Sequence, residues 1–115
     1  MHITSLEKVK KTIPPMEGAE KIFKQIPISS ADGTPNFSFR VFTIEPGGHT
    51  PLHNHAFEHL NYVIEGTGVV VGKERETHIK KGDFVMVPPN ETHQYKNTAA
   101  SGSLVLICAV PKEYE

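Results

Sequence analysis

The sequence predicts an all-β fold, a small sandwich or barrel, and three observations support this prediction. Nine glycines and nine prolines divide the 115 residues into short segments. The residues between them are rich in Val, Ile, Phe, Thr and Tyr and show no helical periodicity. Turn signals such as Asp32-Gly33 and Lys81-Gly82-Asp83 recur about every 8 to 12 residues, which is typical of a sandwich or barrel.

The expected strands follow one another between these turns. Most are rich in β-branched or aromatic residues, and turn residues separate them. In chain order they are Lys21–Ile28, Phe37–Glu45, His49–His55, His59–Glu65, Gly68–Val71, Glu74–Lys80, Phe84–Val87, His93–Asn97 and Ser103–Val110. Further turns are expected at Pro46-Gly47-Gly48, Glu65-Gly66, Gly72-Lys73 and Pro88-Pro89-Asn90.

Two of these strands are apolar on both faces. The first reads FSFRVFTIE, with Phe37 and Phe39 on one face and Phe42 and Ile44 on the other, and the last contains LVLICAV. A barrel has a single interior, so it covers only one face of each strand. We therefore expect the second face to pack on another sheet or another subunit, and a homodimer is the simplest explanation.

The beginning of the chain differs from the rest. Residues 1–20 are more polar and contain Pro14-Pro15, which blocks a helix and a central strand. We expect them to form an irregular arm or an edge strand. Donation of this segment to a neighbouring molecule is an alternative. Residues 21–115 then form the barrel, because a chain of this length supports one hydrophobic core.

Composition excludes several classes of function. The 12 Lys and Arg nearly balance the 13 Asp and Glu, for a formal net charge of -1, so a nucleic-acid partner is not expected. No apolar stretch approaches the roughly 20 residues that span a bilayer, and the first residues lack the apolar core of a secretory signal. Cys108 is the only cysteine, which excludes an internal disulfide and a CxxC metal site. We expect a cytoplasmic protein with no membrane partner.

Four histidines carry the main functional signal. His53, His55 and His59 lie in the run HNHAFEHLNYVIEG, and His93 follows in PPNETHQYKN. Alternate residues of a strand point to one face, so the odd positions 53, 55 and 59 place three imidazoles on the same side. Imidazole is a common ligand of first-row transition metals. A fourth histidine from another strand would complete an all-nitrogen metal site.

The spacing of these histidines resembles the two sequence motifs of the cupin superfamily. The first motif is matched by Gly47, His53, His55, His59 and Gly66. The second is matched by Gly82, Pro88, His93 and Asn97, with Asn90 in place of the usual glycine. Asparagine tolerates the left-handed backbone conformation, so this replacement is mild. The resemblance implies a double-stranded β-helix, the cupin jelly-roll barrel.

The third ligand position departs from many cupins, which have a glutamate where this chain has His59. Glu58 is adjacent, but period-2 alternation places it on the opposite face unless a bulge shifts the register. We favour His59 as the ligand and Glu58 as a group that orients an imidazole or bonds across the barrel mouth. The pattern is similar to four-histidine single-domain cupins. This implies one divalent metal, typically manganese, with iron, nickel, copper or zinc as alternatives.

Two further side chains are candidates for the pocket. Tyr95 lies two residues after His93, so its phenol points to the same interior and could donate a proton or bond a substrate oxygen. Packing as a core aromatic is an equal alternative. Arg40 shares a face with Phe42 and Ile44 and could clamp a carboxylate. We favour an ion pair at a sheet edge or dimer surface, because arginine is rarely buried without a partner.

These features lead to three functional hypotheses. Four neutral imidazoles leave the charge of a divalent ion uncompensated, which favours a small anionic or oxygenated ligand. We therefore expect a metal-dependent oxidoreductase, dioxygenase-like, that acts on a small oxygenated or aromatic compound. A non-catalytic module that binds or senses a small ligand is the first alternative, and a metal-dependent lyase or isomerase without redox change is the second.

Overall fold

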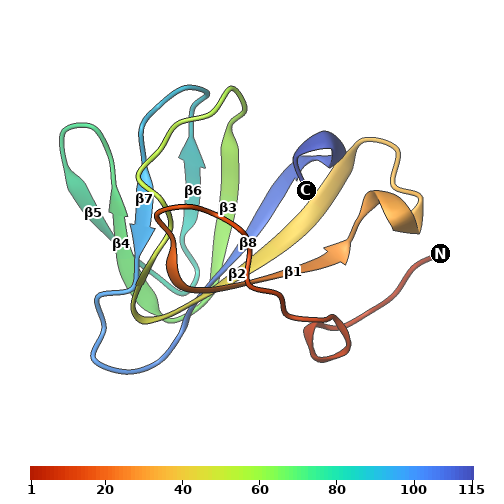
Figure 1. The fold of residues 1–115 in the computed structure, drawn as a ribbon, viewed down its shortest axis with the longest axis horizontal. Coiled ribbons are helices and arrows are strands. Elements are labelled where there is room, and N and C mark those ends of the chain that lie inside the picture. The colour runs from red at the N-terminus through yellow and green to blue at the C-terminus, as the bar shows by residue number, and fades with distance from the viewer.

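The computed structural model describes all 115 residues, and antiparallel strands dominate it (Figure 1). The strands are β1 (Glu20–Ile28), β2 (Phe37–His49), β3 (His59–Glu65), β4 (Thr67–Val71), β5 (Glu76–Lys80), β6 (Phe84–Val87), β7 (Gln94–Lys96) and β8 (Leu104–Pro111). Three 3-10 turns are present: η1 (Leu6–Lys8), η2 (Ser30–Asp32) and η3 (Lys112–Tyr114). The sheet order is β5-β4-β7-β2-β8-β3-β6, with β1 paired to β2. The sheet curls into a half-barrel, which confirms the predicted all-β fold.

Strand β2 links the two halves of the curled sheet. Along most of its length it pairs with β8, and at its far end His49 pairs with Lys96 of β7. Gly47 has a φ of +82°, and a Cβ on Gly48 would lie 2.7 Å from a carbonyl oxygen at the start of β1. Glycine suits the left-handed backbone at position 47, and only glycine fits the close approach at position 48. The turn expected at positions 46–48 is therefore a bend within one continuous strand.

The expected strand His49–His55 is wrong beyond His49, where β2 ends. Pro51 has no N–H group, so the ladder between this segment and β7 cannot continue through it. Pairing is reduced to an isolated bridge between His53 and His93. Residues 50–58 form a loop in place of the expected strand. The other eight expected strands correspond to β1–β8 with small differences at their ends.

The hydrophobic core fills the inside of the half-barrel. Alternating residues of β8 are buried there, and Ile44 of β2 and Val63 of β3 are fully buried beside them. The core consists of Ile22, Phe42, Ile44, Val63, Ile79, Tyr95, Leu104, Leu106, Cys108 and Val110. Burial of each large aliphatic side chain stabilises the fold by about 1.5 to 3 kcal/mol. The apolar inner face of β8 is thus covered as predicted.

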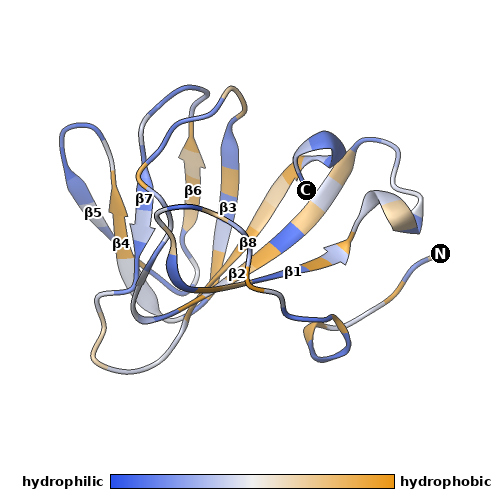
Figure 2. Cartoon of the chain, viewed as in Figure 1, coloured by the Kyte–Doolittle hydropathy of each residue, from blue (hydrophilic) through white to orange (hydrophobic).

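The outer face of the sheet is covered only in part. The arm that precedes β1 lies over it at Gln25, whose side-chain amide donates hydrogen bonds of 2.7 Å and 2.8 Å to carbonyl oxygens of Leu6 and Val9. No second sheet lies over the rest of this face. The part of the sheet that the arm leaves uncovered includes β6. This strand is predominantly hydrophobic, whereas β5 is predominantly hydrophilic (Figure 2).

The N-terminal arm has little regular structure. Residues 1–19 contain η1 and one bridge, between Thr12 and Lys24 of β1. Proline at positions 14 and 15 explains why pairing stops after this bridge. None of the helical turns has the length or the apolar composition that crossing a bilayer requires.

Candidate metal centre

Four imidazoles meet at one end of the barrel interior. His53 and His55 come from the loop 50–58, His59 begins β3, and His93 directly precedes β7. One nitrogen from each ring lies within 4.8 Å of the others. Neighbouring ring centroids are 4.6 to 5.3 Å apart. The structure thus brings together the four histidines that the sequence singles out.

Backbone hydrogen bonds hold the loop histidines against His93. The N–H of His53 donates to the His93 carbonyl at 3.1 Å, and the N–H of His93 donates to the His53 carbonyl at 2.9 Å. The N–H of Asn90 donates to the His55 carbonyl at 2.7 Å, and Asn90 has a φ of +68°. This φ confirms that asparagine takes the left-handed conformation at the motif glycine position. The loop, and not strand alternation, sets the positions of His53 and His55.

The outer nitrogens of three rings are already bonded. Nδ1 of His55 lies 2.6 Å from the Phe57 carbonyl oxygen, and Nδ1 of His93 lies 2.9 Å from the Glu91 carbonyl oxygen. A carbonyl only accepts, so each of these Nδ1 atoms carries a proton, and in the neutral form of such a ring Nε2 has the lone pair. Nδ1 of His59 lies 3.5 Å from the Cys108 sulfur. Such outward bonds fix the tautomer and orientation of metal-binding imidazoles.

The inner nitrogens fit a divalent metal ion. Nε2 of His55 is buried and has no hydrogen-bond partner, which is unfavourable unless a ligand occupies the site. Two imidazole nitrogens on opposite sides of an ion with bonds of about 2.0 to 2.1 Å lie about 4.0 to 4.2 Å apart. The 4.8 Å spread of the four ligand atoms is close to this value. The donor set therefore suits a first-row transition metal.

The surroundings of His53, His55 and His59 favour the neutral imidazole that metal binding requires. Burial, followed by the charges of neighbouring imidazoles and of Arg40, lowers the pKa of His59 to about 3. Burial is also the main reason that the pKa values of His53 and His55 are lowered. A neutral imidazole presents a free lone pair, so the environment favours the ligand form of these side chains.

The histidines line a cavity of about 110 Å³ inside the barrel. Arg40, Tyr95 and Asn61 also line it, and its apolar and aromatic walls include Phe42, Phe57 and Leu106. No aspartate or glutamate lines this cavity. Phe57 stacks on His55 with ring centroids 3.9 Å apart, and Tyr114 stacks on Phe57 at 4.1 Å. The site is a small, mainly apolar chamber around the four imidazoles.

Tyr95 belongs to this chamber, with its hydroxyl proton already engaged. The hydroxyl donates to Oδ1 of Asn61 at 2.7 Å, and Nδ2 of Asn61 donates to the Ile107 carbonyl at 3.3 Å. Burial raises the pKa of Tyr95, so the phenol stays protonated. Sequence reasoning missed Asn61. Its signal was available, because positions 59, 61 and 63 of β3 alternate inward.

The structure does not bring Glu58 to the site. Its side chain is exposed, lies outside the cavity and makes no hydrogen bond. It therefore neither orients an imidazole nor bonds across the barrel mouth here. His59, on the other side of the chain, is buried within the cluster.

Arg40 lies in the cavity wall and not at a sheet edge. Its guanidinium makes no salt bridge, so the ion pair favoured from the sequence is absent. One terminal nitrogen donates to the Cys108 sulfur at 3.1 Å. Cys108 is fully buried, as expected for a small hydrophobe, and contacts both Arg40 and His59.

A curled antiparallel half-barrel with an interior histidine cluster defines a class of small metal-binding β-barrels. The Cupin domain family matches residues 40–110 of the chain. This chain belongs to the cupin family, and its fold is the predicted cupin jelly-roll barrel.

Several curated proteins are similar to part of the chain. An uncharacterised protein of Methanocaldococcus jannaschii is 32% identical over 66 residues, which cover 56% of this chain and 53% of that protein. An acireductone dioxygenase of Leptospira biflexa is 38% identical over 48 residues, which cover 38% of this chain and 27% of that enzyme. The chain spans about half the length, or less, of these curated relatives.

Solved structures are similar over nearly the whole chain. The polyketide cyclase RemF from Streptomyces resistomycificus superposes with a TM-score of 0.92 and 26% identity, over 97% of this chain and 80% of that one. A predicted oxalate decarboxylase from Thermotoga maritima gives a TM-score of 0.82 and 22% identity, over 95% of this chain and 97% of that one. The second likeness supports the fold alone.

Proposed function

We propose that this cupin is a metal-dependent oxidoreductase, dioxygenase-like, that acts on a small oxygenated or aromatic compound inside the barrel. The observation that carries the proposal is the set of four clustered imidazoles in a cavity without a carboxylate. If the ion is six-coordinate, such a set leaves two positions for a substrate and a second small ligand. The partial similarity to acireductone dioxygenases adds support.

Manganese is the metal we favour, with iron, nickel, copper and zinc as alternatives. The four-histidine pattern of small cupins supports manganese. The affinity order of nitrogen sites instead favours copper, nickel or zinc, so metal supply in the cell decides the occupant. When bound, a redox-active metal supplies Lewis-acid polarisation of a substrate oxygen and electron transfer with dioxygen.

The side chains around the histidines would bind the substrate and exclude water. Phe57, Phe42 and Leu106 provide apolar walls that keep the substrate and the imidazoles dry. The hydroxyl of Tyr95 donates to Asn61, which leaves the hydroxyl lone pairs to accept a hydrogen bond from a substrate hydroxyl. Tyr95 therefore positions the substrate in this proposal and does not act as a base.

Oxygen consumption tests the proposal. We expect protein loaded with manganese or iron to consume oxygen above background with at least one member of a phenol, diketone and oxalate panel. His93→Ala is expected to abolish this uptake, while His78→Ala, which removes an exposed histidine outside the cluster, is expected to retain it. Background uptake across the whole panel would count against the oxidoreductase.

A non-redox reaction is the second candidate. The likeness to the polyketide cyclase RemF favours it, because this likeness extends over 97% of the chain. Formation of product without oxygen by zinc-loaded protein would support a lyase or isomerase in place of the oxidoreductase. Stoichiometric ligand binding without turnover would instead support a binding or sensing module.

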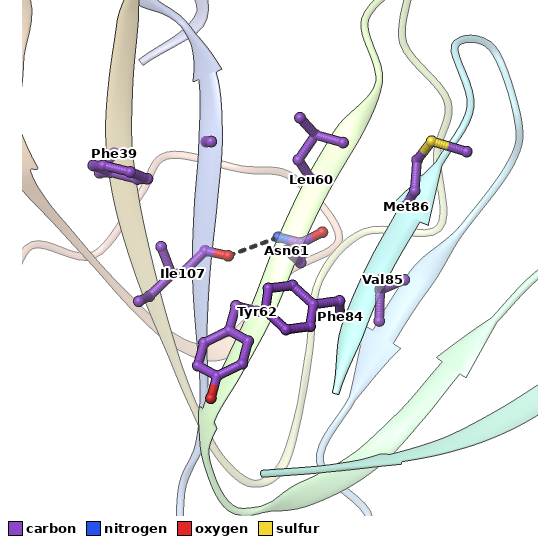
Figure 3. A pocket seen from close by; sticks show the side chains of 9 residues that line it. Phe39, Leu60, Asn61, Tyr62, Phe84, Val85, Met86 and Ile107 are labelled. Atoms are coloured by element: carbon purple, nitrogen blue, oxygen red, sulfur yellow. Dashed lines mark hydrogen bonds between the residues drawn. The ribbon is translucent and has the colours of Figure 1, made fainter. Parts of the chain in front are cut away.

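We also propose that the chain forms a homodimer through the uncovered outer face of the sheet. Around a groove of about 380 Å³, apolar side chains of β2, β3 and β6 stand away from the barrel (Figure 3). Phe39, Leu60, Phe84 and Met86 are 43%, 46%, 82% and 66% exposed. A two-fold dimer needs a self-complementary surface, and this face carries both an apolar hollow and protruding apolar side chains. Eight of the nine lining residues are hydrophobic, which favours burial over solvation.

Sedimentation tests this assembly. We expect wild-type protein to sediment as a dimer and Phe84→Asp to weaken the dimer by at least about 30-fold, the effect of losing about 2 kcal/mol at an interface hot spot. Ile13→Asp places the same charge on a residue that is 76% exposed outside the groove, and it is expected to remain dimeric. A monomer at high concentration in the wild type would contradict the proposal.

A further inference from the structure

Arg40 is a buried cation whose hydrogen-bonding capacity is only partly used. Its side chain is 8% exposed and lines the histidine cavity. One terminal nitrogen donates to the Cys108 sulfur at 3.1 Å, and the other donates to the Tyr114 carbonyl at 3.3 Å. A guanidinium has five N–H groups, and its Nε–H is buried without any partner. Both terminal nitrogens are anchored, and the remaining N–H groups of the guanidinium have no partner.

No acidic side chain compensates this charge. The cavity has no aspartate or glutamate in its wall, and the only ion pair in the structure joins His2 to Asp32. Glu115, next to the Tyr114 turn, accepts hydrogen bonds from Ser30 and Ser38. A buried charge without an opposite charge is costly, so an anion from outside the chain would be strongly favoured here.

Arg40 and the four histidines line the same cavity. A divalent ion bound by the imidazoles would add two positive charges to the same chamber. Two separate cationic groups would then face one small cavity that has no anion of its own.

We propose that Arg40 binds the carboxylate of a small acidic substrate whose second oxygen-bearing group reaches the histidine cluster. This inference rests on the proposed function in one respect, that the cluster holds a metal. Each terminal nitrogen of the guanidinium uses one of its two N–H groups, on Cys108 and on Tyr114, and a planar fork with N–H groups to spare is what a carboxylate accepts through two parallel hydrogen bonds. The aromatic ring of Phe42, with its centroid 5.1 Å from the guanidinium carbon, supports the cation.

The cavity volume restricts the substrate to a compact molecule. The cavity around the histidines has a volume of about 110 Å³, smaller than the roughly 300 to 1,000 Å³ of pockets for drug-sized ligands. A short carboxylic acid with a second oxygen-bearing end group suits this space better than an extended chain or a nucleotide. Malonate, which has two carboxylates and a short carbon chain, is a suitable probe, and malonamide is its neutral isostere.

Calorimetric titration of the zinc-loaded protein tests the proposal without turnover. We expect the wild type to bind malonate at least 10-fold more tightly than malonamide. Arg40→Met should weaken malonate binding by about 10- to 100-fold, because a hydrogen-bonded charge pair is lost, and should change malonamide binding by less than about threefold. Arg75→Met removes an exposed arginine outside the cavity and is expected to leave both affinities unchanged.

Arg40→Lys provides a second variant that keeps the charge and loses the planar fork. It is expected to bind malonate with an affinity between those of the wild type and Arg40→Met. If Arg40→Met does not fold, the malonate affinity of Arg40→Lys tests the role of Arg40. Zinc content and thermal unfolding are measured for each variant. Equal losses for malonate and malonamide, or no preference in the wild type, would overturn the inference.

The failure of this inference is distinguishable from failure of the proposed function. Binding of malonate that depends on Arg40, without oxygen uptake for any compound, would remove the oxidoreductase and leave the carboxylate site intact. Oxygen uptake by the wild type, together with equal malonate affinities of the wild type and Arg40→Met, would keep the oxidoreductase and refute the carboxylate site.

Discussion

His59→Ala is expected to lower the affinity of the protein for a divalent metal by more than about 100-fold, whereas Glu58→Ala is expected to leave it unchanged. Residues that merely support a metal ligand already account for about 10- to 100-fold in affinity, and loss of a ligand itself is more severe. His59 contributes one of the four clustered nitrogens, while the side chain of Glu58 is exposed. Elemental analysis of protein from its own host, with chelator competition in vitro, measures the effect.

The adjacent positions of the two residues make this comparison sharp. His59 begins β3 and Glu58 directly precedes it, so a general effect on the start of this strand would appear in both variants. His78→Ala serves as a further control, because it removes an exposed imidazole outside the cluster. Loss of metal in Glu58→Ala with retention in His59→Ala would show that our assignment of the ligand is wrong.

The histidine cluster was predictable from the sequence, although one step of the reasoning was wrong. Alternation correctly places His59 inside, because β3 is a regular strand. His53 and His55 lie in a loop, where Pro51 interrupts pairing and period-2 alternation has no meaning. They still join the cluster, because the motif spacing reflects a loop shape that alternation does not describe.

The hydrogen-bond partners of Arg40 and Tyr95 could not be predicted from the sequence. Alternation correctly groups Arg40 with Phe42 and Ile44 on the inner face of β2. Whether a carboxylate accompanies the guanidinium depends on residues distant in sequence, such as Cys108 and Tyr114, which here supply neutral acceptors. No local pattern identifies these partners. For the same reason, the hydroxyl of Tyr95 could be placed inside but not paired with an acceptor.

The outer face illustrates a further limit of local patterns. Two-sided apolar strands indicate that both faces need cover, and the inner cover was predicted correctly. The arm before β1 covers part of the outer face through the hydrogen bonds of Gln25. The sequence does not predict which part of this face the arm covers and which part, around Phe84, stays exposed. The covered part depends on the path of the arm, which has little regular structure.

Gly66→Ala is expected to destabilise the fold by more than about 4 kcal/mol, a large part of the 5 to 15 kcal/mol typical of a domain. Gly66 connects β3 to β4 with a φ of +84°, and a Cβ there would lie 2.1 Å from the carbonyl oxygen of Ser103. The obstacle is backbone at the start of β8, beside fully buried Leu104, so it cannot move without opening the core. Urea unfolding monitored by circular dichroism measures the loss.

Gly82→Ala isolates the steric part of this effect. Gly82 also has a positive φ, +98°, but no atom lies within 4 Å of the position that a Cβ would take. Only the backbone strain of an L-residue applies, about 1 to 3 kcal/mol. The difference between the two variants then reports the clash with β8. Insoluble Gly66→Ala beside folded Gly82→Ala would agree with this reasoning, and equal losses in the two variants would refute it, because conformational strain alone would then explain both.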